Sequence, residues 1–108
     1  MINNVCLVGR IANDIEVKEF EKGKVANISL AVQRKFKNAE GNYETDFINC
    51  NVWNEQTNIL KEYCKKGDLI GVVGRLQTSV YEVEGTKRKA VDLMVEKISL
   101  LQPKKTEE

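Results

Sequence analysis

The sequence predicts an all-β fold with a single helix, and three observations support this prediction. Apolar and polar residues alternate in five separate segments, which is the period of a strand with one buried face. One segment between the third and fourth of these has helical spacing instead. The chain has 108 residues, a length that suits one domain with a single core. Together these observations favour a small barrel over a layered α/β architecture, which would need more helices.

The five predicted strands are separated by glycine-containing or charged segments. The strands are expected over residues 4–12, 25–36, 43–53, 69–81 and 88–100. In the second strand, Ala26, Ile28 and Leu30 share one face, because side chains alternate between the two faces of a strand. Turns are expected at three glycines: Gly23, Gly41 and Gly85.

The helix is predicted over residues 55–66. Its apolar side chains fall on one face: Ile59, Leu60, Tyr63 and Cys64. We expect Asn54 to cap its N-terminus and Gly67 to end it. Five strands with a helix between the third and fourth are typical of the OB-fold, a small partly open barrel. We therefore expect residues 1–102 to form one OB-fold domain, followed by a short disordered end over residues 103–108 without an acidic tail.

The residue types that the chain lacks argue against catalysis and metal binding. The chain has no histidine, and Cys6, Cys50 and Cys64 show no C-x-x-C spacing, so we expect no metal and no cofactor. Neither a G-x-S-x-G nucleophile motif nor a phosphate-binding glycine loop occurs. We therefore expect a binding protein and not an enzyme. The three cysteines are expected to be buried, reduced thiols.

The location of the protein is predicted from the segments that direct export. The N-terminal residues show no basic stretch followed by a long apolar run, which a secretory signal would need. The apolar runs are too short to span a membrane. We therefore expect a cytoplasmic, nucleoid-associated protein.

Large aromatic residues lie on the polar faces of the predicted strands, where the barrel core cannot cover them. Phe47 and Trp53 share the polar face of the third strand, Tyr81 ends the fourth, and Phe36 follows the core residues of the second. A ring stacks on any base, so these four rings suit single-stranded nucleic acid. Alternatively they pack under loops, against the helix or at a subunit contact. Tyr63 is expected in the core, because it lies on the apolar face of the helix.

Basic residues cluster near the same turns and rings. The net charge is only +1, so this distribution is more informative than the bulk charge. The candidate phosphate contacts are Arg34, Lys35, Lys37, Arg75, Lys87 and Arg88. The alternative is a solvated surface, which we expect for the lysines on the wet face of the helix: Lys61, Lys65 and Lys66.

Several motifs, in this order, resemble those of the bacterial single-stranded DNA-binding proteins. They are Met1–Val5, Leu7–Arg10, Val25–Val32, Asp46–Cys50, Val52–Trp53, Leu60–Lys61, Lys66–Asp68 and Val73–Thr78. The resemblance covers about residues 1 to 101. It implies an OB-fold homotetramer that binds single-stranded DNA in replication, recombination and repair. It also implies base stacking at Phe36, Phe47, Trp53 and Tyr81, although the first and last are tryptophan in some members.

The sequence departs from this family at its C-terminal end. Many members carry a flexible linker and an acidic tip that recruits repair and replication proteins. This sequence ends with Lys104–Glu108 and shows neither feature. The resemblance therefore implies DNA binding, but not recruitment of partner proteins through a tail.

Two other functions remain open at the level of sequence. An OB-fold domain can serve protein interaction, as in a replication-restart accessory protein, and the aromatic face would then be a protein interface. RNA binding is the second alternative, because base stacking tolerates either sugar.

Overall fold

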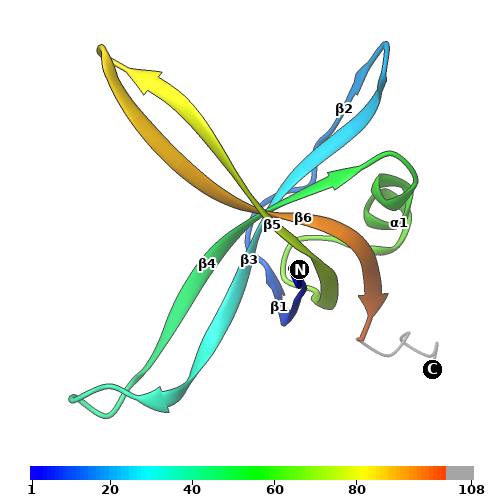
Figure 1. Cartoon of the computed structure of the whole chain (residues 1–108). Helices are drawn as coiled ribbons and strands as arrows, with labels where there is room; N and C mark the ends of the chain where they lie inside the picture. Colours follow the sequence, from blue (N-terminus) through cyan, green and yellow to red (C-terminus); the bar gives the residue numbers. More distant parts are fainter. Residues whose placement is uncertain (102–108) are drawn as a thin grey trace, which may run out of the picture.

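A computed structural model describes residues 1–101, which form a barrel of strands with one helix beside it (Figure 1). The elements are β1 (Val5–Ile11), β2 (Val17–Phe20), β3 (Gly23–Lys37), β4 (Tyr43–Trp53), α1 (Glu55–Tyr63), β5 (Leu69–Val83) and β6 (Thr86–Leu100). The sheet order is β1-β5-β6-β4-β3-β2, and pairing of β1 with β3 closes the barrel. The predicted all-β fold with one helix is therefore confirmed. The predicted end over residues 103–108 lies outside the described residues.

The short strand β2 was not among the predicted strands. It pairs antiparallel with the start of β3, from Val17 opposite Ala26 to Phe20 opposite Gly23. Val17 is half-buried, and the rest of β2 is exposed. A strand with almost no buried face shows no apolar alternation, so the period that identified the other strands is absent here. The helix therefore follows the fourth strand of the structure, although its place in the barrel is as expected.

The core of the barrel consists mainly of strand side chains that follow the period of two, together with Leu60 of the helix. Its members are Ile11, Ala26, Ile28, Leu30, Cys50, Val52, Leu60, Ile70, Val72, Leu93, Val95 and Ile98. Leu60 comes from α1 and is fully buried, so the helix packs against the barrel through this residue. Truncating a buried leucine of this kind to alanine costs about 2–5 kcal/mol, because it removes apolar contacts and leaves a cavity.

Two glycines allow backbones to approach closely where the barrel bends. A Cβ atom at Gly9 would collide with the carbonyl oxygen of Ala31, and one at Gly74 with that of Met94. Gly74 also sits at a shift in the register between β5 and β6. A glycine inside a strand commonly marks such a bulge or bend. Both glycines are therefore required by the same steric constraint.

The helix differs from its prediction at both ends. It spans Glu55–Tyr63 and therefore ends three residues earlier than expected. Its C-cap residue is Cys64, so Gly67 does not end the helix. Asn54 makes no side-chain capping hydrogen bond. Its Oδ1 instead accepts from the backbone N–H of Lys24 at 3.1 Å, which joins the helix start to β3. Tyr63 is 65% exposed, so its expected place in the core is wrong.

The three cysteines lie in three different environments. Cys50 is buried, and loss of hydration raises its thiol pKa to about 11. Cys64 is half-buried, and burial also raises its pKa. Cys6 is exposed, so the prediction of three buried thiols is wrong for this residue. It lies on β1 between Val5 and Leu7, whose side chains pack against the core from the opposite face of the strand.

Two long hairpins extend from the barrel, one formed by β3 and β4 and the other by β5 and β6 (Figure 1). Both reach well beyond the core. On β5, every residue from Arg75 to Val83 is exposed. The β5–β6 hairpin closes with Glu84 and Gly85, which both have positive φ, as a two-residue turn of this kind requires. The hairpins therefore offer extended surfaces that the barrel core does not need.

Candidate nucleic-acid interface

Four neighbouring strands, β3, β4, β6 and β5, turn one continuous face away from the core. On β4, Cys50 and Val52 are buried, so the residues of opposite parity point outwards. The strand registers carry this face across the sheet: Ser29 lies opposite Asn49, and Arg75 lies opposite Met94. We call this surface the outer sheet face. Its residues are Asn27, Ser29, Phe47, Asn49, Asn51, Trp53, Arg75, Gln77, Ser79, Tyr81, Asp92 and Met94.

Side-chain contacts across and along the strands show that these residues share a face. Asn51 Nδ2 donates to Asp92 Oδ2 at 3.4 Å and approaches Met94 Sδ at 3.5 Å. Arg75 donates to Gln77 Oε1 at 2.8 Å. Neither Asp92 nor Met94 is among the site residues that the sequence predicts. Both join the face through the parallel pairing of β4 with β6, which local sequence patterns do not reveal.

All four predicted stacking rings are exposed. The exposed fractions are 83% for Phe36, 65% for Phe47, 44% for Trp53 and 48% for Tyr81. Phe47, Trp53 and Tyr81 lie on the outer sheet face. Phe36 lies in an irregular stretch of β3, between the Gln33–Thr45 and Lys37–Tyr43 pairs. None of the four belongs to the buried core of residues 1–101, although slightly more than half of Trp53 and of Tyr81 is covered.

The predicted phosphate contacts divide into free and engaged cations. Lys35, Lys87 and Arg88 are exposed, and within the described part of the chain no ion pair involves them. Lys37 Nζ lies 5.7 Å from the centre of the Tyr43 ring, a cation–π distance. Arg75 is 3.8 Å from Glu96, a long and exposed pair that water and salt screen.

Arg34 is the most engaged of the candidate cations. Its Nε and Nη2 donate to the two carboxylate oxygens of Asp46, at 3.0 and 2.9 Å, and its Nη1 donates to Glu44 Oε1 at 3.0 Å. This hydrogen bonding lowers the pKa of Asp46 and raises the pKa of Arg34. The positive charge of Arg34 is therefore already matched by carboxylates in the free chain.

Residues 2–101 match the model of the single-strand binding protein family. The chain belongs to that family. Single-stranded DNA-binding protein 1 of Lactococcus lactis is 43% identical over 99% of this chain and 73% of its own length. Single-stranded DNA-binding protein B of Bacillus subtilis is 39% identical over 99% of this chain and 96% of its own length.

Solved structures of the single-strand binding proteins confirm the barrel. A Plasmodium falciparum member in complex with single-stranded DNA superimposes with a TM-score of 0.85 at 21% identity, over 94% of this chain and 96% of that one. A small single-stranded DNA-binding protein of Streptomyces coelicolor gives a TM-score of 0.74 at 21% identity, over 93% and 95%. At this identity the likeness establishes the OB-fold, which was the predicted architecture.

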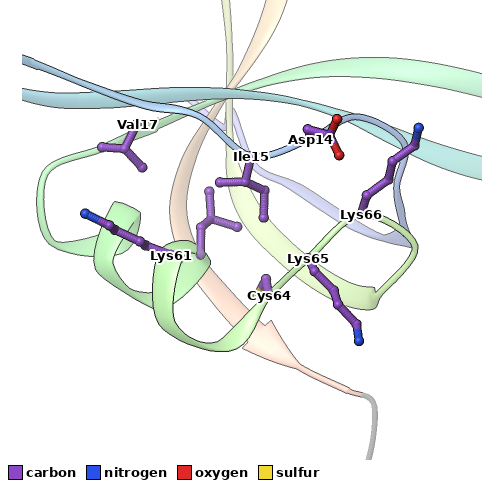
Figure 2. Close-up of a pocket in the computed structure, with 8 residues that line it drawn as sticks. Asp14, Ile15, Val17, Lys61, Cys64, Lys65 and Lys66 are labelled. Atoms are coloured by element: carbon purple, nitrogen blue, oxygen red, sulfur yellow. The ribbon is translucent and has the colours of Figure 1, made fainter.

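This member of the single-strand binding protein family also has a pocket that involves none of the predicted site residues. The pocket has a volume of about 320 Å³ and lies between α1 and the segment that precedes β2 (Figure 2). Its lining residues are Asp14, Ile15, Val17, Leu60, Lys61, Cys64, Lys65 and Lys66. The three lysines are exposed, as expected for the wet face of the helix.

Two further kinds of site were sought within residues 1–101. No group of cysteine and carboxylate side chains there is arranged to hold a metal ion. No helix in that range combines the length and apolar character needed to cross a membrane.

Proposed function

We propose that this chain binds single-stranded DNA without sequence preference, through its outer sheet face and the two long hairpins. Bases stack on Phe36, Phe47, Trp53 and Tyr81, and cations on the hairpins hold the phosphates. The observation that carries this proposal is the exposure of three large rings on one sheet face, outside the core that would otherwise explain them. Each stacked base contributes about 1–3 kcal/mol by alanine substitution.

The chemistry between the rings supports binding without sequence preference. The other members of the outer sheet face are mostly amides and hydroxyls, such as Asn49, Asn51, Gln77 and Ser79. These groups both donate and accept hydrogen bonds, so they accommodate the edges of any base. Stacking is equally tolerant, since every base has a π-face.

The cations that we assign to phosphate are Lys35, Lys37, Arg75, Lys87 and Arg88. Lys35 and Lys87 lie close to the turns of the two hairpins, and Arg88 lies opposite Tyr81, a member of the outer sheet face. We assign Arg34, which sequence analysis placed in the same set, a different role below. Phosphate binding releases counterions, so affinity should fall as salt rises, with a logarithmic slope of about −0.7 per contact on single-stranded DNA.

The wider biology follows from the family and is part of the same proposal. The chain acts as a cytoplasmic, nucleoid-associated binding protein in DNA replication, recombination and repair, without catalysing a reaction and without a cofactor. It assembles as a homotetramer. Light scattering after size-exclusion chromatography, with and without a DNA oligomer, tests the assembly. A monomeric mass in both samples would contradict the tetramer.

Fluorescence of Trp53, the single tryptophan of the chain, tests the binding mode directly. Titration with an oligo-dT should quench it to saturation, and less strongly at equal DNA concentration when salt is raised. An oligo-U competitor measures the preference for DNA over RNA in the same cuvette. Absence of quenching, together with no shift in a gel assay, would contradict DNA binding and favour a protein-interaction role for the outer sheet face.

A further inference from the structure

A cluster of four polar side chains braces the hairpin formed by β3 and β4. Arg34 binds both oxygens of Asp46 and one oxygen of Glu44. The second oxygen of Glu44 accepts from Asn38 Nδ2 at 3.2 Å. We call Arg34, Asn38, Glu44 and Asp46 the Arg34 cluster. Its formal charge is −1, because one guanidinium meets two carboxylates.

The Arg34 cluster lies on the other face of the hairpin from Phe47. Asp46 pairs with Val32, and both share the parity of the buried residues of their strands. Phe47 is the next residue along β4 and therefore points to the opposite side. Arg34 binds Asp46 and Glu44, so it occupies the side of the hairpin away from the outer sheet face. A phosphate bound beside Phe47 would therefore lie on the opposite side of the hairpin from the guanidinium of Arg34.

The Arg34 cluster also spans the place where backbone pairing is irregular. The ladder between β3 and β4 runs without a shift to Gln33–Thr45 and resumes at Lys37–Tyr43. The intervening stretch of β3 is longer than that of β4, as in a β-bulge, so backbone hydrogen bonds do not fix its shape. Two side-chain links from Arg34 to β4 cross this stretch. The stretch carries Phe36 and Lys35, which are both assigned to DNA.

The same cluster reaches the turn of the hairpin through Asn38. Asn38 Oδ1 accepts from the backbone N–H groups of Glu40 and Asn42, at 2.9 and 3.0 Å. The Asn38 side-chain amide donates to Glu44, so the turn is tied to the ion pairs. A continuous chain of hydrogen bonds thus connects Asp46 on β4, Arg34 on β3 and the turn.

We propose that Arg34 is a positioning residue, which holds Lys35 and Phe36 in place for DNA through its carboxylate partners and does not bind phosphate itself. This inference rests on the proposed function and refines it. Its negative net charge makes the Arg34 cluster a poor place for a phosphate. The fork of an arginine, with several donors in one plane, suits this bridging role in a way that a lysine ammonium does not.

Two variants give opposite results for the positioning and phosphate-binding roles. Asp46→Asn removes a negative charge and one of the two Asp46 carboxylate oxygens that bind Arg34, which leaves Glu44 as the remaining carboxylate partner of Arg34. If Arg34 positions the hairpin, the variant binds oligo-dT more weakly, whereas a phosphate-binding Arg34 would make it bind more tightly. Arg34→Lys keeps the charge and loses the fork. It should weaken oligo-dT binding at every salt concentration, because Lys35 and Phe36 are no longer held in place, whereas a phosphate-binding Arg34 would tolerate the change to lysine.

Lys35→Met is the matched control, because it removes a neighbouring exposed charge outside the Arg34 cluster. It should reduce the magnitude of the salt slope by about 0.7. Tighter binding by Asp46→Asn, or wild-type affinity in Arg34→Lys, would overturn the positioning role. If the wild-type chain does not bind oligo-dT, the proposed function fails by itself. The backbone amide resonances of residues 38–42 then still test whether the Arg34 cluster holds the turn. These resonances should shift in Arg34→Lys and not in Lys35→Met.

Discussion

The two long hairpins are held in shape by different means. Between β5 and β6 the ladder runs without a shift from Gly74–Val95 to Val83–Thr86, and a two-residue turn closes it. Backbone hydrogen bonds are enough to define that hairpin. Between β3 and β4 the ladder is interrupted, and the side chains of the Arg34 cluster replace the missing pairs. The irregular β3–β4 hairpin thus uses the cation of Arg34 for its own structure.

This difference decides which charges are available to a ligand. Lys87 and Arg88 lie on the regular hairpin and form no ion pair within residues 1–101. On the irregular hairpin, Arg34 carries three hydrogen bonds to carboxylates, while its neighbour Lys35 extends into solvent. A count of basic residues therefore overstates the positive charge near the β3–β4 turn.

The largest effect is expected on the free energy of unfolding, from a substitution in the barrel core at the base of a hairpin. Leu30 at the base of the β3–β4 hairpin is fully buried, and Phe36 farther along the same strand is 83% exposed. Leu30→Ala should lower the free energy of unfolding by about 2–5 kcal/mol, because it leaves a cavity. Phe36→Ala should change it by less than about 0.5 kcal/mol. Urea unfolding without DNA measures both, at equal protein concentration. Equal losses would show that the distal hairpin belongs to the folding core.

The next largest effect is expected from a ring on the outer sheet face. Phe47→Ala should weaken oligo-dT binding by about 1–3 kcal/mol, or about 5- to 150-fold, because a stacked base is lost. Tyr63→Ala is the matched control, since both rings are 65% exposed and Tyr63 lies on α1. Fluorescence titration gives the two affinities. A similar loss in both variants would mean that exposed rings act generally and that the outer sheet face has no special role.

Which side chains face the core and which face outwards follows largely from the alternation of side chains along a strand. Alternation along β4 correctly predicts that Phe47 and Trp53 face outwards while Cys50 is buried. The same rule applied to β1 places Cys6 outside, although its residue type favoured burial. Local periodicity thus outweighs the average preference of a residue type. Leu76 and Val80 have core parity on β5 yet are 45% and 63% exposed, because the hairpin has left the barrel there.

The features that sequence analysis missed depend on partners distant in the chain. Asn54 is a good helix cap by type, but its side chain binds the backbone of Lys24. Tyr63 has helical core spacing, but the helix buries only a narrow stripe at Thr57 and Leu60. The engagement of Arg34 depends on the interruption of the β3–β4 ladder. Strand register and bulges arise from tertiary packing, so a single sequence does not reveal such pairings.

A smaller effect is expected on the salt dependence of DNA binding, from the unpaired cations of the β5–β6 hairpin. Replacing Lys87 and Arg88 together with glutamine should reduce the magnitude of the salt slope by about 1.4, since about 0.7 is lost for each phosphate contact. Replacing Lys61 and Lys65 with glutamine removes the same charge from the rim of the pocket beside α1 (Figure 2). That control should leave the slope unchanged. Equal reductions in both double variants would indicate a general field effect in place of direct contacts.

The smallest effect concerns the pH at which the irregular hairpin loses its brace. The hydrogen bond from Arg34 lowers the pKa of Asp46 in the folded chain below its ordinary value of 3.8. A group with a lowered pKa stabilises the fold above its unfolded pKa, and that contribution disappears as pH falls through the folded value. The Arg34 Nε resonance, followed by NMR, should therefore titrate below pH 3.8. In Asp46→Asn this titration should vanish. A midpoint at or above the ordinary value would mean that the ion pair does not persist in solution, and that the β3–β4 hairpin is shaped by its backbone after all.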